Sequence, residues 1–98
     1  MRRIVAKSTL RIFWEKHRDC EQHLKTWYET ARKAHWKTPV DVKSDYRHAS
    51  ILVHNRVVFN IKGNEYRLVV KINYERGWIF IRFIGTHRAY DRVDATII

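Results

Sequence analysis

The sequence predicts an α+β fold, in which two N-terminal helices pack on one face of an antiparallel β-sheet. In residues 10–34, apolar side chains recur at helical spacing, whereas residues 56–62, 66–73 and 78–84 alternate between apolar and polar with a period of two. Gly63-Asn64, between the first two alternating stretches, is a typical hairpin turn, so these strands should run antiparallel. A chain of 98 residues has room for one small core, and residues 1–98 are therefore expected to form a single domain.

The N-terminal half is expected to supply a short strand and both helices. Arg3–Ala6 is a short apolar run that predicts an opening strand, added to the antiparallel sheet. The first helix has one apolar face, formed by Leu10, Phe13, Trp14 and His17. Asp19 is the predicted N-cap of the second helix, with Gln22 at the capping-box position. Thr38-Pro39 should end this helix, because a residue before proline disfavours the helical conformation. Residues 40–50 predict a loop or a single helical turn.

Strand parity predicts which side chains share a face of the sheet. A two-residue turn at Gly63-Asn64 places Asn60 opposite Arg67 and Phe59 opposite Leu68. The core face of that second strand then consists of Tyr66, Leu68, Val70 and Ile72. The last hairpin needs a loop of even length, because a slip of one residue would move every side chain to the other face. The core face of the last strand is then predicted to hold Ile79, Ile81 and Phe83, and its other face Trp78, Phe80, Arg82 and Ile84. A short helical or irregular tail is expected over residues 87–95.

The composition indicates an anionic partner. Lys and Arg total 20 against 10 Asp and Glu, which gives a formal net charge of +10. So large an excess on a small domain is typical of nucleic-acid binding, whereas no helix shows the basic amphipathic pattern of a membrane-surface protein. Cys20 is the only cysteine, and no segment reads as a signal peptide or a membrane span, so we expect a cytoplasmic protein.

The sheet face that the helices leave open is predicted to bind RNA. This face should carry five Lys or Arg side chains, an asparagine and two aromatic rings, namely Arg56, Lys62, Arg67, Lys71, Arg82, Asn60, Trp78 and Phe80. Cations bind phosphates, and aromatic rings stack on unpaired bases, so the pattern fits single-stranded RNA. The alternative is an ordinary solvent-facing sheet, which is often rich in Lys and Arg.

The stretch after the last strand, residues 85–91, carries the side chains best suited to chemistry. A capped helix start would explain its polar residues without any function. An RNA-cleaving site is the sharper hypothesis, because the attacking 2′-hydroxyl belongs to the substrate and the protein need only orient the phosphate, neutralise charge and transfer protons. His87 is the candidate proton carrier, since imidazole exchanges a proton near neutral pH. The side chains expected to hold the phosphate are Arg67, Lys71 and Arg82, and Tyr90 would position the 2′-hydroxyl or transfer a proton.

Metal and cysteine chemistry have little support in the sequence. The six histidines form no His-x-x-x-His pair, and no second cysteine exists to complete a metal site. Cys20 falls on the buried stripe of the second helix and is a poor candidate nucleophile. We therefore expect neither a metal nor another cofactor.

Two motifs carry a family resemblance. Val58-Phe-Asn-Ile-Lys-Gly-Asn-Glu-Tyr-Arg-Leu-Val69 and Ile84-Gly-Thr-His-Arg-Ala-Tyr-Asp91 resemble the HigB family of toxins from bacterial type II toxin–antitoxin systems. The resemblance extends upstream to Trp27, Trp36 and residues 38–43. Carried over by position, the signature comprises Asn64, Tyr66, Arg67, Thr86, His87, Tyr90 and Asp91, with Arg88 as a further basic residue for RNA.

This resemblance implies a RelE-like fold and a metal-independent mRNA interferase that acts on mRNA in the A site of the 70S ribosome. The expected products are a 2′,3′-cyclic phosphate and a 5′-hydroxyl. The implied partner is a HigA-like helix-turn-helix antitoxin, through which the toxin would reach operator DNA. Ala89 stands where the family often has Glu, so this position is not expected to be catalytic. RelE-like toxins differ in which residues serve as acid and base, and the assignment between His87 and Tyr90 stays open.

Two other functions remain compatible with the sequence. A non-catalytic RNA-binding or ribosome-associated protein would use the same basic face without cleaving RNA. A small structural or interaction module would not depend on the charges of Arg67 and Arg82 at all.

Overall fold

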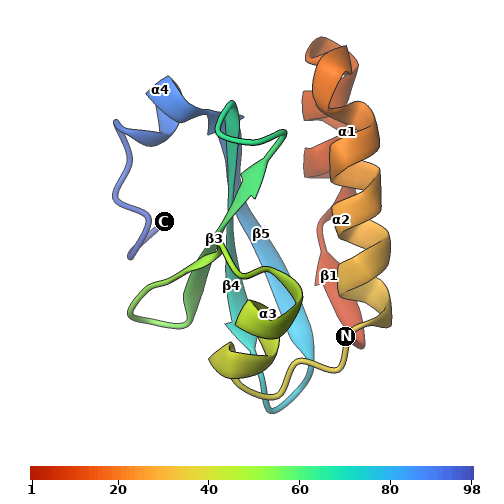
Figure 1. Cartoon of the computed structure of the whole chain (residues 1–98), viewed down its shortest axis with the longest axis vertical. Helices are drawn as coiled ribbons and strands as arrows, with labels where there is room; N and C mark the ends of the chain where they lie inside the picture. The colour runs from red at the N-terminus through yellow and green to blue at the C-terminus, as the bar shows by residue number, and fades with distance from the viewer.

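The computed structural model describes all 98 residues as an α+β fold built on one five-stranded sheet (Figure 1). The elements in chain order are β1 (Arg3–Val5), α1 (Lys7–Lys16), η1 (Arg18–Cys20), α2 (Glu21–Lys33), α3 (Pro39–Asp45), β2 (Ser50–Ile51), β3 (Arg56–Ile61), β4 (Tyr66–Asn73), β5 (Trp78–Thr86) and α4 (His87–Tyr90). The strand order is β1-β5-β4-β3-β2, with β1 parallel to β5 and all other neighbours antiparallel. The predicted fold class is thereby confirmed.

The sheet lies between two layers, a larger one of helices and a smaller one formed by the C-terminal segment (Figure 1). Helices α1 and α2 cover one face, and the C-terminal segment with α4 lies on the other side (Figure 1). The main core fills the space between the helices and the sheet, with Leu10, Leu24, Trp27, Phe59, Leu68, Val70 and Ile72 at or near zero exposure. Burying these side chains supplies the main driving force for folding. None of the helices combines the length and apolar character needed to cross a bilayer.

The start of α2 differs from the prediction. Asp19 is not the N-cap; it lies in the 3₁₀ turn η1, and Cys20 takes the cap position without a side-chain hydrogen bond. The Asp19 carboxylate instead accepts hydrogen bonds from the Tyr66 hydroxyl at 2.8 and 2.9 Å. A partner distant in the sequence thus outcompetes the local cap, which a sequence pattern cannot reveal.

The predicted end of α2 is also wrong. The helix ends at Lys33, and the amino group of Met1 donates to the main-chain oxygens of Ala31 and Arg32, both at 3.0 Å. Thr38-Pro39 instead begins α3: Thr38 forms a capping box with Asp41, and proline occupies the first helical turn, where its missing N–H costs nothing.

The register of the first hairpin and the even loop length of the last one agree with the predictions, up to one bulge. Asn60 pairs with Arg67 and Phe59 with Leu68, as expected. In the last hairpin Asn73 pairs with Trp78 and Val70 with Ile81, but Val69 pairs with Phe83. Arg82 is therefore an extra residue in β5.

This β-bulge corrects two predicted orientations. One inserted residue reverses the parity beyond it. Phe83 lies on the face opposite the helices, packed beside Val58 and Val69, and Ile84 packs against the main core. The sequence had placed each of them on the other face.

The face opposite the helices is not open along its whole length. Val58 and Val69 are buried under Ala95, and Ile98 packs against the same cluster. Arg56 is only 9% exposed and donates to the main-chain oxygen of Ile98 from Nε at 3.1 Å and from a terminal nitrogen at 2.8 Å. The prediction that this face is open is therefore wrong for its middle, which the C-terminal segment covers, and for Arg56.

Candidate active site

The candidate site lies where β5 ends and α4 begins. Thr86 is the N-cap of α4 and accepts a hydrogen bond from the Ala89 N–H at 3.1 Å. The N–H of His87 donates to the main-chain oxygen of Glu65 at 3.0 Å, which ties α4 to the β3–β4 hairpin. The helix start that the sequence suggested is present and capped by Thr86, and the cap also fixes the backbone that carries His87.

Gly85 is required by the packing beneath this turn. A Cβ atom at Gly85 would lie 2.5 Å from the Phe83 ring and 3.4 Å from the Cβ of Ala89. The Phe83 ring therefore occupies the space that any larger residue would need. Tyr90 packs against the same small cluster as Phe83, so glycine here allows α4 to sit close to the sheet.

His87 has an acidic partner one helical turn away. Its Nδ1 lies 3.3 Å from an Asp91 carboxylate oxygen, and both side chains are about half exposed. The carboxylate can fix the orientation of the ring, which leaves Nε2 directed away from Asp91 for proton transfer. No role was predicted for Asp91, although its spacing of four residues from His87 is the signal for such a pair.

Arg67 reaches the same end of the sheet from β4. Its guanidinium lies 5.9 Å from the centre of the Tyr90 ring, and a terminal nitrogen donates to the main-chain oxygen of Asn64 at 3.3 Å. Arginine over an aromatic ring keeps its charge and most of its donors free, and so can bind a phosphate. We call Arg67, His87, Tyr90 and Asp91, which are candidates for catalysis, the catalytic cluster.

Other predicted phosphate and base ligands lie away from this cluster. Lys71 is four residues along β4 from Arg67, roughly 13 Å at strand spacing, with the buried Val69 between them. Trp78 and Phe80 lie at the opposite end of β5, where Trp78 has Arg3 and Arg76 over its ring at 5.6 and 5.7 Å. The basic residues at this far end thus surround a tryptophan instead of extending the catalytic cluster.

Four further predicted residues have mixed placements. Arg82, at the bulge, and Arg88, on α4, are both exposed. Asn60 is exposed on β3 opposite Arg67, as predicted. Lys62 does not lie on the open face; it has a positive φ of 53° and its ammonium lies 3.0 Å from Asp19 on the helix side. A positive φ at a non-glycine residue is uncommon. Here it directs the Lys62 side chain away from the face that the alternation along β3 predicts.

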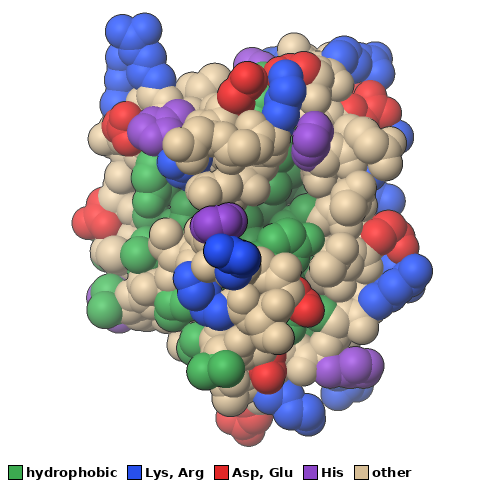
Figure 2. Space-filling model, in the orientation of Figure 1, with side chains coloured by type: hydrophobic (Ala, Val, Ile, Leu, Met, Phe, Trp, Pro, Cys, Tyr) green, Lys and Arg blue, Asp and Glu red, His purple; other side chains and the backbone are tan.

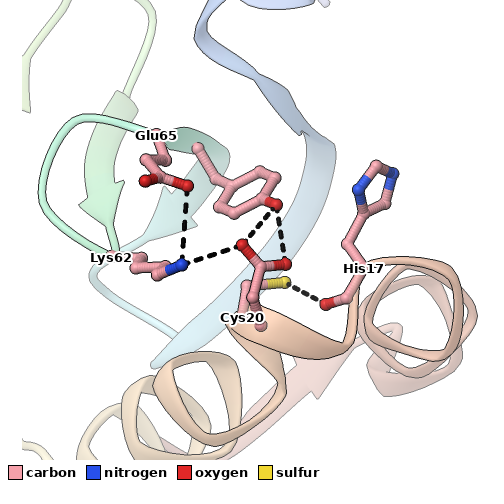
Figure 3. Close-up of polar contacts among 6 residues, drawn as sticks. His17, Cys20, Lys62 and Glu65 are labelled. Atoms are coloured by element: carbon pink, nitrogen blue, oxygen red, sulfur yellow. Dashed lines mark hydrogen bonds and ion pairs between the residues drawn. The ribbon is translucent and has the colours of Figure 1, made fainter.

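Lys62, Asp19 and Tyr66 form a polar network between η1 and the β3–β4 hairpin (Figure 3). Hydrogen bonds from Lys62 and Tyr66 hold the pKa of Asp19 below its usual value. Burial and the Asp19 carboxylate raise the pKa of Tyr66 to about 12. A tyrosine held so firmly in its protonated form is suited to a structural role and poorly suited to proton transfer.

Cys20 lies beside this network and is fully buried. Its thiol donates to the main-chain oxygen of His17 at 3.1 Å, as Figure 3 shows, and burial raises the thiol pKa to about 11. The ring of His17 stacks on Phe13 at 4.2 Å, at the edge of the helical core as predicted. No group of three or more His, Cys, Asp or Glu side chains comes together where it could hold a metal ion.

Together these features define a small, basic α+β protein with a partly exposed Arg-His-Tyr-Asp cluster at one end of its sheet. Residues 20–93 match the model of the HigB toxin family, described as the RelE-like toxic component of a toxin–antitoxin system. The match covers most of the chain, and the chain belongs to this family.

Curated relatives have names that agree with this assignment. The mRNA interferase toxin HigB of Escherichia coli (strain K12) is 27% identical over 90 residues, which cover 90% of this chain and 86% of the relative. The mRNA interferase HigB of Shigella flexneri matches with the same identity and coverage. These names support the sequence-based prediction of an RNA-cleaving toxin.

Proposed function

We propose that this chain is an mRNA interferase that cleaves RNA without a metal, by attack of the substrate's 2′-hydroxyl on the adjacent phosphate. One observation supports the proposal most directly: the Arg67 guanidinium contacts the Tyr90 ring at the same end of the sheet where His87 contacts Asp91. The products would be a 2′,3′-cyclic phosphate and a 5′-hydroxyl. The names of the relatives support the substrate class.

Each member of the catalytic cluster has a proposed role. Arg67 binds the phosphate and neutralises the charge that grows on its oxygens in the transition state. His87 transfers a proton through Nε2, with its ring oriented by Asp91. Tyr90, whose ring lies against the Arg67 guanidinium, positions the 2′-hydroxyl or transfers the second proton. Arg82 and Arg88 attract the flanking RNA through their exposed charges.

The proposed partners follow from the family. A toxin–antitoxin system supplies an antitoxin, which we propose to be a HigA-like helix-turn-helix protein that carries the complex to operator DNA. We place the activity in the cytoplasm, on mRNA in the A site of the 70S ribosome. The net charge of +10 fits approach to an RNA-rich surface.

The proposal is tested by mapping the 5′ ends of cellular mRNA after induction of the wild-type chain and of His87→Ala. The wild type should create new 5′-hydroxyl ends and arrest growth, and His87→Ala should lose both while staying folded. His35→Ala is the matched control, because it removes a histidine outside the catalytic cluster.

A non-catalytic RNA-binding protein predicts a different outcome. It would bind ribosomes or RNA with strong salt dependence but produce no new 5′ ends. Such a result for the wild type would contradict the proposal, and so would full cleavage by His87→Ala.

A further inference from the structure

The largest cavity in the molecule is not part of the catalytic cluster. It has a volume of about 610 Å³ and lies between the segment that follows α3 and the β3–β4 hairpin. We call it the loop pocket; its principal lining residues are Tyr46, Arg47, His48, Phe59, Asn60 and Asn64. Ligand pockets in proteins are typically about 300–1,000 Å³, so this cavity can hold a small planar group. Figure 2 shows a hollow with a hydrophobic floor near the centre of the face in view, with histidine and Lys or Arg side chains at its rim.

The floor of the loop pocket is aromatic and firmly supported. The half-buried ring of Tyr46 meets Phe59 edge to face at 5.1 Å and Trp36 at 6.2 Å. Phe59 is buried and also stacks with Trp36 at 5.9 Å. A tyrosine ring that is held in place but still partly exposed offers a surface on which an unpaired base can stack.

The wall of the pocket is fixed by its own hydrogen bonds. The Lys43 ammonium donates to the main-chain oxygens of Arg47 and Ala49 at 2.6 and 2.8 Å. The Trp36 indole N–H donates to the Asp45 carboxylate at 2.9 Å. Asp45 is the one acidic residue in the wall, and its carboxylate therefore already has a hydrogen-bond partner. The segment is thereby held in one shape before any ligand arrives, which lowers the entropic cost of binding.

Four polar side chains at the pocket are left without partners in the protein. Arg47, His48, Asn60 and Asn64 are exposed, and none of their side-chain atoms takes part in a hydrogen bond within the chain. Gly63 adds open space, because a Cβ atom there would meet nothing within 4 Å. Amides can pair with the edge of a base, and the arginine and histidine can face a phosphate.

The loop pocket adjoins the catalytic cluster through the β3–β4 hairpin. Asn64 lines the pocket, and its main-chain oxygen accepts the hydrogen bond from Arg67. Asn60 also lines the pocket and pairs with Arg67 across the two strands. An RNA strand whose phosphate lies at Arg67 would therefore have a neighbouring nucleotide at the pocket.

We propose that the loop pocket binds one unpaired base of the mRNA beside the cleaved bond, and so determines the base preference at that position. This inference rests on the proposed RNA-cleaving function and adds a specificity site to it. Tyr46 stacks on the base, Asn60 and Asn64 read its edge, and Arg47 and His48 contact the backbone. RNA fits the pocket better than a protein segment does, because two of its free side chains, Arg47 and His48, can face phosphates and the other two are amides that can pair with a base edge.

The test compares base frequencies around the cleavage positions in 5′-end maps from cells expressing the wild type, Asn60→Ala, His48→Ala or Arg47→Ala. His48→Ala and Arg47→Ala, which remove proposed backbone contacts, should weaken cleavage evenly at all sites. Asn60→Ala should still cleave but lose about tenfold in base preference at one fixed position near the cut, since well-placed polar contacts to a base edge discriminate by about that factor or more. Arg11→Ala is the matched control for Arg47→Ala, because it removes an exposed arginine on α1, outside both sites.

Tyr46→Leu provides a second measurement on the purified protein. Its affinity for a single-stranded RNA oligonucleotide with 2′-O-methyl groups, which cannot be cleaved, should fall about tenfold through lost stacking. Circular dichroism melting would show whether Tyr46→Leu remains folded, and Asn60→Ala serves as the replacement variant if it does not.

The outcomes separate this inference from the proposed function. If the wild type cleaves RNA but shows no base preference near the cut, or Asn60→Ala keeps the wild-type preference, the loop pocket does not read a base and the cleavage function stands. If these variants cleave normally but bind the antitoxin more weakly, the pocket is a protein-binding site and the inference is wrong. If the wild type makes no new 5′ ends, both the function and the inference fail.

Discussion

The two faces of the sheet are built from the same strands but serve different purposes. On the face toward α1 and α2, Leu68, Val70 and Ile72 of β4 are all fully buried in one continuous core. On the other face the same strand alternates half-buried Arg67, buried Val69 and exposed Lys71. The C-terminal segment covers only the middle of that face. One face therefore secures the fold, and the other leaves both ends of the sheet accessible to a ligand.

The largest expected effect is a loss of cleavage activity, without a loss of stability, on substitution of His87 or Asp91 on the partly covered face. His87→Ala should lower cleavage by about 10²–10⁴-fold, and Asp91→Asn by a smaller factor, because Asp91 only positions the ring. Both side chains are about half exposed, so neither change should lower the free energy of unfolding by more than about 0.5 kcal/mol. Cleavage rates and thermal unfolding measure the two quantities.

Asp91→Glu is the control for the positioning role, because it retains a carboxylate within reach of His87. It should recover part of the activity that Asp91→Asn loses. Equal activity in Asp91→Asn and the wild type would remove Asp91 from the cluster.

The next effect compares two neighbouring valines on opposite faces. Val70→Ala and Val69→Ala delete the same atoms from fully buried sites. Val70 lies among large core residues that cannot move far, so its loss should cost about 2–3 kcal/mol of unfolding free energy. Val69 lies under the C-terminal segment, which can close a small cavity, and its loss should cost about 1 kcal/mol. Chemical denaturation of both variants measures the difference, and equal costs would mean that the two faces are packed with equal rigidity.

The same contrast explains how far the sequence could predict the structure. The helix-covered face depends on local periodicity and strand parity, which predict the register of the first hairpin and, as far as Ile81, the parity of the last one. The bulge at Arg82 could not be predicted, because it depends on how the end of β5 packs against the covering segment. The burial of Arg56 and the contact between Asp19 and Tyr66 join residues more than 40 positions apart, which no local pattern encodes.

The candidate site was predictable in part. His87, Tyr90 and Arg67 were selected from residue chemistry and the family motifs, and the structure brings Arg67 and Tyr90 into contact. Lys71, Trp78 and Phe80 share the expected face but lie toward its other end, since parity predicts the face and not what covers it. The loop pocket had no periodic signal at all, because its wall is an irregular segment held by Lys43.

A smaller effect concerns the covering segment itself. Arg56→Met keeps much of the side-chain volume but removes the hydrogen bonds to the main-chain oxygens of Ile98 and His54. We expect a loss of about 1–2 kcal/mol in unfolding free energy. Amide hydrogen exchange should become faster mainly in residues 91–98, while the main core remains protected. Uniformly faster exchange would show that this segment is part of the main cooperative unit.

The smallest effect is the pH dependence that arises from the polar network on the helix-covered side. The folded pKa of Asp19 is lowered from 3.8, so its stabilising contribution is complete above that value and is lost as the pH falls through the folded pKa. The folded pKa of Tyr66 is raised from 10.0 to about 12, so its contribution is present below pH 10 and is lost as the pH rises from 10 to about 12. The pKa of Lys62 is also raised, by its hydrogen bond to Asp19, and its contribution fades at alkaline pH in the same way.

Tyr66→Phe tests this network because it removes one hydroxyl from a buried ring and keeps the packing. It should cost about 1 kcal/mol at neutral pH, through the lost hydrogen bond to Asp19. It should also abolish part of the stability loss between pH 10 and 12, whereas Asp19→Asn should reduce the loss below pH 4. Because the network lies on the side of the sheet away from α4, Tyr66→Phe should leave the cleavage rate of the folded protein unchanged. A fall in that rate without a change in stability would instead assign Tyr66 to the chemistry and remove the division between the two faces.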